Sequence, residues 1–315
     1  MMEMIDIEEV SFKPWGRCVR LSNGDIELFA TLDFGPRIIR FGRVGGKNIM
    51  FEDTDDEVNK KGYESLFKEN FGAEKGVWHI RGGHRLWVSP EALPRNYYPD
   101  NEPVEYEKIK NGVVLIPPRQ AWTHFQFKIE VCMDESKNEV YLIHTITNNA
   151  PFDVEFAPWA LTVLAKGGKE LFPQPKKDTG LLPNRTLSVW PYTNLADKRV
   201  HFGNRYITLR QDETVDSEFK IGINSEHGWA AYQNFGDMFV KYFDVKENGV
   251  YPDGGMSFET YTSKLILEME SLGELKKISP QESVIHKEKW KYIKDVENYP
   301  DNEDEIDEFV KKYII

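Results

Sequence analysis

The sequence predicts an all-β fold, with one large antiparallel β domain over residues 1–293. An acidic linker and a short C-terminal α-helix are expected within residues 294–315. The strongest observation is a pair of runs, residues 125–132 and 140–147, in which apolar and polar side chains alternate around the polar turn 134–138. This alternation is the period of a half-buried strand, so the two runs predict an antiparallel hairpin. Short runs rich in β-branched and aromatic residues also recur along the chain, and a convincing helical period appears only near its end.

The first hundred residues are expected to form short strands interrupted by turns and one charged insert. Asn23-Gly24-Asp25 precedes the apolar run 26–30, which is a strong hairpin signal. The charged segment 52–74 predicts a short helix or a long surface loop. Because it leads directly into Trp78, it could form a wall or lid over a pocket. Residues 94–103 contain three prolines, which exclude regular structure there.

The second half of the chain is expected to add further strands and then the helix. Strand patterns cover residues 154–164, 206–210, 219–224, 229–233, 238–245 and 258–270. In the C-terminal segment, residues 301–304 offer N-cap chemistry. Apolar side chains follow at helical spacing, namely Ile306, Phe309, Val310, Tyr313 and Ile314. This amphipathic helix is expected to pack on the edge of the sandwich or on a second subunit.

Composition excludes several function classes. The 315 residues carry 40 Lys and Arg against 52 Asp and Glu, for a net charge of −12. An acidic protein is a poor match for nucleic acid, whose binding needs a positive surface, and for an anionic membrane. Two cysteines, Cys18 and Cys132, are too few for a disulfide framework. The N-terminal residues 1–10 lack an apolar signal segment, so a cytoplasmic location is expected by default.

A basic and aromatic stretch, residues 78–91, is the first candidate site. It places two His, two Arg, two Trp and a Glu around Gly82-Gly83. Arg and Glu side chains form directional hydrogen bonds to hydroxyls, and Trp offers a flat apolar face. A sugar presents both kinds of surface, which makes these residue types suitable for binding one. We therefore expect His79, Arg85, Trp87 and Glu91 to hold a saccharide, together with Trp159 further along the chain. The alternative is a strand that enters a turn, with the Trp residues in the core and the Arg residues in ion pairs.

A pair of glutamates in the late apolar run is the second candidate site. If residues 265–270 form a regular strand, Glu268 and Glu270 share one face with Ile266, and Leu265, Leu267 and Met269 lie on the other. Two carboxylates this close repel each other, so one of them can hold a proton near neutral pH. This is the property of a general base or acid. The exposed polar face of an edge strand would give the same pattern.

The remaining histidines give weaker signals. His84 and His227 are the candidates for a general acid, whereas His144, flanked by Leu142 and Ile146 on its face, is expected to be a core residue. No clustered Cys and His spacing predicts a metal site. There is also no phosphate-binding or dinucleotide-binding glycine motif. No metal or organic cofactor is therefore expected.

The sequence resembles the galactose-mutarotase-like superfamily, in its uncharacterised branch close to aldose 1-epimerases. The resemblance rests on Gly82-Gly83-His84-Arg85-Leu86-Trp87, on Ile146-Thr147-Asn148-Asn149, and on the closing segments 268–273, 278–283 and 286–290. It spans most of residues 15–293 and implies a large antiparallel β-supersandwich that binds a sugar on a concave sheet face. In the epimerases of this family, a Glu on a late strand takes the proton of the anomeric hydroxyl and a His protonates the ring oxygen.

The resemblance implies that Glu268 or Glu270 is the base and that Arg85 binds sugar hydroxyls. The chain departs from the family where the epimerases carry a His after Thr-Asn, because Thr147-Asn148 is followed here by Asn149. This departure leaves sugar binding as the expectation and puts catalysis in question.

Three hypotheses follow. The first is a carbohydrate-binding protein that acts as an aldose 1-epimerase-like enzyme, with Glu270 or Glu268 as the base and His84 or His227 as the acid. The second is a non-catalytic sugar-binding or sensing module of the same fold. The third is a structural subunit whose C-terminal helix mediates homo-oligomer formation.

Overall fold

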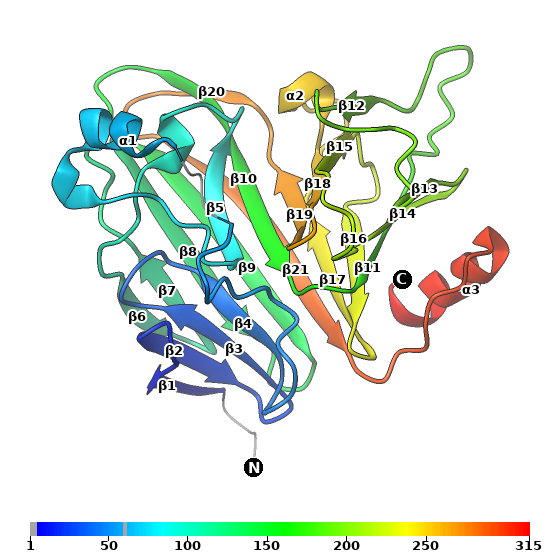
Figure 1. The fold of residues 1–315 in the computed structure, drawn as a ribbon, viewed down its shortest axis with the longest axis horizontal. Coiled ribbons are helices and arrows are strands. Elements are labelled where there is room, and N and C mark those ends of the chain that lie inside the picture. The colour runs from blue at the N-terminus through cyan, green and yellow to red at the C-terminus, as the bar shows by residue number, and fades with distance from the viewer. Residues whose placement is uncertain (1–4, 59–61) are drawn as a thin grey trace.

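Two antiparallel β-sheets stacked face to face form most of the molecule (Figure 1). The structure is a computed structural model, and it describes residues 5–58 and 62–315. Over this range, the first sheet has 11 strands in the spatial order β1 (Asp6–Ser11), β2 (Arg17–Ser22), β3 (Ile26–Thr31), β4 (Ile38–Arg43), β5 (Gly83–Ser89), β10 (Val154–Leu164), β19 (Leu267–Leu272), β18 (Phe258–Thr262), β15 (Phe219–Ile223) and β12 (Leu187–Val189), with β20 (Lys276–Ile278) paired to β10.

The second sheet supplies the opposite layer. Among the same residues it has 10 strands in the order β13 (Val200–Phe202), β14 (Tyr206–Arg210), β11 (Lys169–Pro173), β16 (Trp229–Asn234), β17 (Asp237–Phe243), β21 (Ser283–Ile293), β9 (Glu139–Asn148), β8 (Phe125–Met133), β7 (Gly112–Ile116) and β6 (Glu105–Ile109). The predicted all-β sandwich is therefore confirmed.

The main hydrophobic core lies between the two sheets and takes side chains from both. Phe41 of β4 contacts Phe239 of β17 and Trp290 of β21, with ring centroids 5.9 and 5.6 Å apart. In β8, buried and partly exposed side chains alternate along the whole strand. This is the pattern that predicted a half-buried strand, because successive side chains point to opposite faces of a sheet. Burial of one face against the other sheet holds the two layers together.

The strongest sequence prediction, the hairpin 125–147, is confirmed as β8 and β9, which pair from Phe125↔Asn148 to Met133↔Val140. The hairpin whose turn contains Asn23 is also present, and its two strands are β2 and β3. The predicted strand 258–270 is wrong in one respect. The chain reverses at Ser263, whose backbone NH donates to the Ile266 carbonyl at 3.0 Å, so this segment forms the two antiparallel strands β18 and β19.

The helices are short and lie outside the sheets. Those described are α1 (Glu64–Phe71), α2 (Pro252–Gly255) and α3 (Glu303–Tyr313), with the 3₁₀ turns η1 (Ala73–Lys75) and η2 (Arg95–Tyr97). Helix α1 and turn η1 belong to the charged insert 52–74, of which residues 59–61 lie outside the described residues. Turn η2 is a single short turn within the proline-containing segment that was expected to be irregular.

Helix α3 is the predicted C-terminal helix, and its N-cap is Asn302, whose side chain accepts from the backbone NH of Asp304 at 2.9 Å. Figure 1 shows it beside β11 and β14, at the end of the second sheet. Its apolar residues pack there against Trp229, Met238 and Val240. An interface between copies of the chain would therefore use the exposed face of α3, and it stays a prediction. None of the helices that the structure describes is long and apolar enough to cross a membrane.

Candidate functional site

A cleft of about 460 Å³ opens on the face of the first sheet that points away from the second sheet. Its floor is formed by neighbouring strands β5, β10, β19, β18 and β15. The cleft brings together six residues predicted from the sequence, namely Arg85, Trp87, Glu91, Trp159, Glu268 and Glu270. The early basic and aromatic stretch and the late acidic strand therefore share one hollow.

Strand alternation explains which side chains reach the cleft. Glu268 and Glu270 of β19 line it with Ile266, whereas Leu267 and Met269 point into the main core. Leu265, which was predicted to share the face of Leu267 and Met269, lines the cleft instead, because it precedes the regular strand β19. On β5, Arg85 and Trp87 face the cleft in the same way. The register of the strands determines which cleft side chains are neighbours. Leu161 of β10 pairs with Arg85 of β5 on one side and with Glu270 of β19 on the other. Side chains on one face of adjacent strands are close enough to interact.

Arg85 is held at one side of the cleft by a carboxylate and by aromatic rings. Its Nη1 donates to Glu268 Oε1 at 3.1 Å, and both side chains are nearly fully buried. The guanidinium carbon lies 4.4 Å from the centroid of the Trp87 ring and 5.6 Å from that of Trp78. The Nε atom of Arg85 is buried and has no hydrogen-bond partner among the described residues. The guanidinium is therefore fixed in orientation and retains a donor.

A second charged group lies beside the first, around Lys220 of β15. Lys220 Nζ is 2.8 Å from Glu270 Oε2 and 2.9 Å from Glu259 Oε2. Trp159 Nε1 also donates to Glu270 Oε2, at 2.9 Å. Lys220 Nζ lies 4.8 and 4.7 Å from the ring centroids of Trp159 and Trp190. One ammonium thus joins two carboxylates between two indole rings.

Burial and charge shift the proton affinities of this group. Burial raises the pKa of the Glu270 carboxyl, and the Lys220 ammonium offsets only part of that effect. Burial likewise raises the pKa of Glu259, to about 8. Burial alone would lower the pKa of Lys220, but the two carboxylates outweigh it and hold that pKa well above its usual range. At neutral pH, Lys220 is therefore charged and Glu259 carries a proton.

Aromatic rings form the walls of the cleft. Trp87 contacts Trp78 at a centroid distance of 5.1 Å and Trp159 at 5.7 Å. Trp190 and the phenols of Tyr97, Tyr192 and Tyr261 complete this lining. Burial raises the pKa of all three phenols, so they remain protonated. Tyr97 donates to Glu91, and Tyr261 donates to Glu218 Oε1 at 2.8 Å. Rings of this kind suit the CH-rich face of a sugar, and hydroxyl donors suit its edge.

The cleft continues into a second hollow of about 300 Å³. Glu91, Trp159, Trp190 and Lys220 line both hollows. The second one adds Glu259, together with Asp253. Asp253 Oδ2 accepts from Ser89 Oγ at 2.9 Å. Lys220 therefore stands at the junction, with Glu270 on the side of the larger hollow and Glu259 on the side of the smaller one.

The structure does not bring the predicted histidines into the cleft. His84 lies between Gly83 and Arg85 on β5, so alternation turns its side chain toward the second sheet, where it is fully buried. His79 is not among the lining residues, and its Nδ1 lies 2.8 Å from Asp56 Oδ1. His227 lines another hollow, which shares no residue with the cleft. His84 and His227 therefore lie outside the cleft, and neither is placed to give a proton to a ligand bound there.

His84 instead belongs to a polar network between the two sheets. Its Nε2 lies 2.8 Å from His144 Nε2, and its Nδ1 lies 2.9 Å from Thr162 Oγ1. Lys241 Nζ is 2.9 Å from Glu288 Oε1, with both side chains fully buried. Burial lowers the pKa of His84 and His144, so both rings are neutral. The placement of His144 in the core agrees with its sequence pattern.

Three members of this network, His84, His144 and Glu288, are donors of the types that bind metal ions, and their ligand atoms lie within 4.8 Å of one another. These atoms are already engaged. Glu288 accepts from Ser271 Oγ at 2.6 Å and from Trp290 Nε1 at 2.8 Å, in addition to its contact with Lys241. Because the Lys241 ammonium already supplies a positive charge, the network is complete as an internal structural element.

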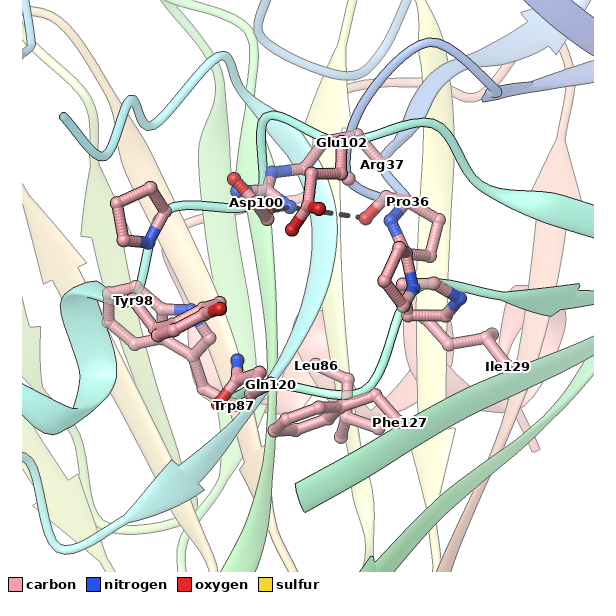
Figure 2. A pocket seen from close by; sticks show the side chains of 14 residues that line it. Pro36, Arg37, Leu86, Trp87, Tyr98, Asp100, Glu102, Gln120, Phe127 and Ile129 are labelled. Carbon is pink, nitrogen blue, oxygen red and sulfur yellow. Dashed lines mark hydrogen bonds and ion pairs between the residues drawn. The ribbon is translucent and has the colours of Figure 1, made fainter. Parts of the chain in front are cut away.

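A much smaller cavity, of about 50 Å³, lies behind Trp87 (Figure 2). Figure 2 shows Leu86 and Phe127 at its base, with Arg37 and Asp100, which form an ion pair, at the opposite end. A cavity of this size holds roughly a few water molecules. It is therefore too small for a sugar ring, and the cleft remains the site that can accommodate one.

The sequence prediction missed Lys220 and Tyr261, which line the cleft, and Glu259, which lines the second hollow. Lys220 lies between Phe219 and Ile221, which are both buried in the core, so the alternation of a strand places its side chain on the other face. The same argument applies to Glu259 and Tyr261 in the segment predicted as one strand. The signal was present in the sequence, but it identifies a cleft only once the strand order is known.

Comparisons with known proteins place the fold. No protein-family model matches the sequence, and no curated protein matches it. Solved structures do resemble it. A TPR-domain-containing protein from Parabacteroides distasonis aligns with a TM-score of 0.60 and 11% identity, over 90% of this chain and 48% of that larger protein. A candidate aldose 1-epimerase from Klebsiella pneumoniae aligns with a TM-score of 0.56 and 11% identity, over 97% of this chain and 86% of that one.

A galactose mutarotase-like protein from Lactobacillus casei is also similar, with a TM-score of 0.54 and 10% identity, over 87% of this chain and 99% of that one. At these identities the likeness concerns the fold. The resemblance predicted from the sequence is confirmed at that level, and the chain has the galactose mutarotase-like β-supersandwich fold.

Proposed function

We propose that this protein binds a saccharide in the cleft and interconverts the anomers of an aldose there. The observation that carries the proposal is the meeting of Arg85, Trp87 and Trp159 with the carboxylates Glu268 and Glu270 in one hollow. The indole rings offer apolar faces to a sugar ring, while Arg85 and Glu268 form a fixed pair that can bind hydroxyls. The galactose mutarotase-like fold supports the same proposal.

Glu270 is the base in this proposal. Its Oε2 is held by Trp159 Nε1 and Lys220 Nζ, whereas its Oε1 is buried and has no hydrogen-bond partner in the described part of the chain. A carboxylate fixed in this way has one oxygen free to accept the proton of an anomeric hydroxyl. Its raised pKa makes it a stronger base than a carboxylate in water, which favours proton transfer near neutral pH.

The charge of the cleft favours neutral sugars over phosphorylated or acidic ones. The lining of the larger hollow includes six carboxyl side chains, from Glu57, Glu91, Asp216, Glu218, Glu268 and Glu270, and three cations, from Arg85, Lys220 and Lys264. Lys220 and Arg85 are already paired with carboxylates. A phosphate would add a charge of about −2 to a negatively charged hollow. We therefore expect weak binding of sugar phosphates.

Sugar binding without turnover is the second candidate, and one observation favours it. The lining residues of the two hollows, as the structure describes them, include no histidine. A binding or sensing module needs the aromatic walls and the hydroxyl-binding groups, but it needs no acid. Tight binding of a saccharide without a change in its anomeric exchange rate would select this function.

The proposal predicts that the protein accelerates exchange between the α and β forms of a neutral aldose. Magnetization-exchange NMR on several aldoses and on their 6-phosphates measures this rate directly. We expect exchange above the uncatalysed rate for at least one neutral aldose and little or none for its phosphate. A faster rate for the phosphates would contradict the charge argument, and the absence of both exchange and binding for every sugar would refute the proposal.

A further inference from the structure

Glu259 and Glu270 form an unusual pair at the junction of the cleft and the second hollow. They are direct cross-strand neighbours in the β18–β19 hairpin, and the side chain of each is 1% exposed. Like charges placed directly opposite each other in a sheet are destabilising, and burial increases the cost of each charge. A structural role alone would be met by a smaller or neutral residue at one of the two positions. The pair therefore calls for a specific explanation.

Lys220 accounts for only one of the two negative charges. It contacts both carboxylates, at 2.8 and 2.9 Å, and it is the cation that faces Glu259 from β15. The other charged groups around Glu259 are Glu270 on β19 and Asp253 on α2, and both are acidic. With one ammonium between two carboxyls, the balanced state has one proton on the pair. Burial raises the pKa of both carboxyls, to about 8 for Glu259, and we assign the proton to Glu259 because Glu270 Oε2 accepts from both Trp159 Nε1 and Lys220 Nζ.

Local packing leaves room for the Glu259 side chain. Gly222 of β15 is its cross-strand neighbour on the other side, and a Cβ at Gly222 would lie 3.2 Å from Glu259 Cγ and 2.7 Å from Met256 Cγ. Glu259 Oε1 is buried without a hydrogen-bond partner among the described residues, and Glu259 lines the second hollow. A protonated carboxyl needs an acceptor for its hydrogen. A ligand atom in the hollow can provide it.

We propose that Glu259 is the proton donor of this site, giving its proton to the ring oxygen of the sugar, with Lys220 as the residue that positions it opposite Glu270. This inference rests on the proposed anomer exchange and supplies the acid that no histidine provides. The anomeric oxygen and the ring oxygen are both bonded to C1, so the base and the acid must stand close together. Glu270 and Glu259, bridged by a single ammonium, meet this requirement.

The proposed step balances without a further reactant. Glu270 Oε1 takes the proton of the anomeric hydroxyl, and the electron pair of that O–H bond forms the C1 carbonyl. The bond between C1 and the ring oxygen breaks, and the ring oxygen takes the proton of Glu259. Glu270 is then protonated and Glu259 is ionised. After rotation about the C1–C2 bond, the reverse transfers close the ring on the other face of C1 and restore both groups.

The test compares Glu259→Gln, which keeps the shape and removes the acid, with Glu259→Asp, which keeps a carboxyl. Glu155→Gln on β10, an exposed residue outside the lining of both hollows, is the matched control. In the wild type, we expect kcat/KM for anomer exchange to fall as the pH rises through about 8, because Glu259 loses its proton there. Glu259→Gln should lower the rate by about 10²-fold or more and abolish this alkaline limb. Glu259→Asp should retain the limb, and Glu155→Gln should match the wild type.

A second readout does not depend on activity. The infrared difference spectrum between wild type and Glu259→Gln should contain the C=O stretch of a protonated carboxyl at pH 6, and this band should be absent at pH 10. An active wild type with an unchanged rate and alkaline limb in Glu259→Gln would overturn the donor role while leaving anomer exchange intact. The absence of the infrared band would overturn the protonated state of Glu259 whether or not the protein is an enzyme.

Discussion

Replacing Glu288 by Gln is expected to lower the free energy of unfolding by about 3–5 kcal/mol. Among the described residues, Glu288 is the only ion-pair partner of Lys241. Both side chains are fully buried between the sheets. Lys241 Nζ also donates to the carbonyls of Ala160 and Met269, at 3.0 and 3.2 Å. These carbonyls do not neutralise the ammonium. The variant therefore leaves a buried charge beside neutral histidines, which is among the costliest single changes in a protein core.

Urea unfolding followed by Trp fluorescence measures this loss. Glu308→Gln on α3, which removes the carboxylate of an exposed ion pair with Lys311, should leave the midpoint unchanged, since exposed pairs contribute little. The double variant Lys241→Met/Glu288→Leu should recover a large part of the lost stability, because it removes both charges together. A loss of less than about 1 kcal/mol in Glu288→Gln would show that the network tolerates an unpaired ammonium and would contradict this account.

Replacing Glu270 by Gln is expected to lower the rate of anomer exchange by about 10²–10⁴-fold. Gln retains an oxygen that can accept from Trp159 Nε1 and Lys220 Nζ, and Lys220 keeps Glu259 as a partner. The main change is then the loss of a group that can take a proton. The reduction should appear in kcat, with a smaller effect on KM, because the base acts in the transition state.

Glu268→Gln is the comparison that separates the two carboxylates of β19. Glu268 accepts from Arg85 Nη1 at 3.1 Å, so its replacement should disturb the orientation of Arg85 and chiefly raise KM. The rates of both variants can be measured by the same NMR exchange experiment. If Glu270→Gln retained the wild-type kcat while Glu268→Gln lost it, Glu268 would be the base and the roles assigned here would be reversed.

The sequence was sufficient for elements whose signals are local. The β8–β9 hairpin follows from strict alternation around a polar turn, and α3 follows from an Asn cap and a helical period. The β18–β19 hairpin was missed because its turn, at Ser263 and Lys264, contains none of the Gly, Pro, Asn or Asp residues that mark a reversal. The alternation breaks in this turn, because Leu265, Ile266 and Leu267 follow one another as apolar residues and the core-facing positions change from even numbers at Phe258 to odd numbers at Leu267.

The candidate site could be predicted only in part, because alternation shows which side chains share a face of one strand but not which strands are neighbours. Arg85 and Trp87 share a face of β5, and the alternation that joins them excludes His84. Because successive side chains of a strand point to opposite faces, His84 cannot share the face of its neighbour Arg85, and the sequence alone indicates this. Lys220 and Glu259 could not be assigned, because their proximity to Glu270 depends on the order β19-β18-β15 in the sheet. Strand order depends on tertiary packing and not on local sequence.

The central claim is that a saccharide occupies the cleft between β5 and β15, and NMR of the Trp indole groups tests it most directly. Trp78, Trp87, Trp159 and Trp190 line the cleft, whereas Trp15 donates to Glu52 and Trp290 is fully buried between the sheets. Titration of the ¹⁵N-labelled protein with a neutral aldose should shift the indole signals of Trp87, Trp159 and Trp190 and leave those of Trp15 and Trp290 in place. Saturation by the sugar without any shift at Trp87, Trp159 and Trp190 would show that the cleft is not where a sugar binds.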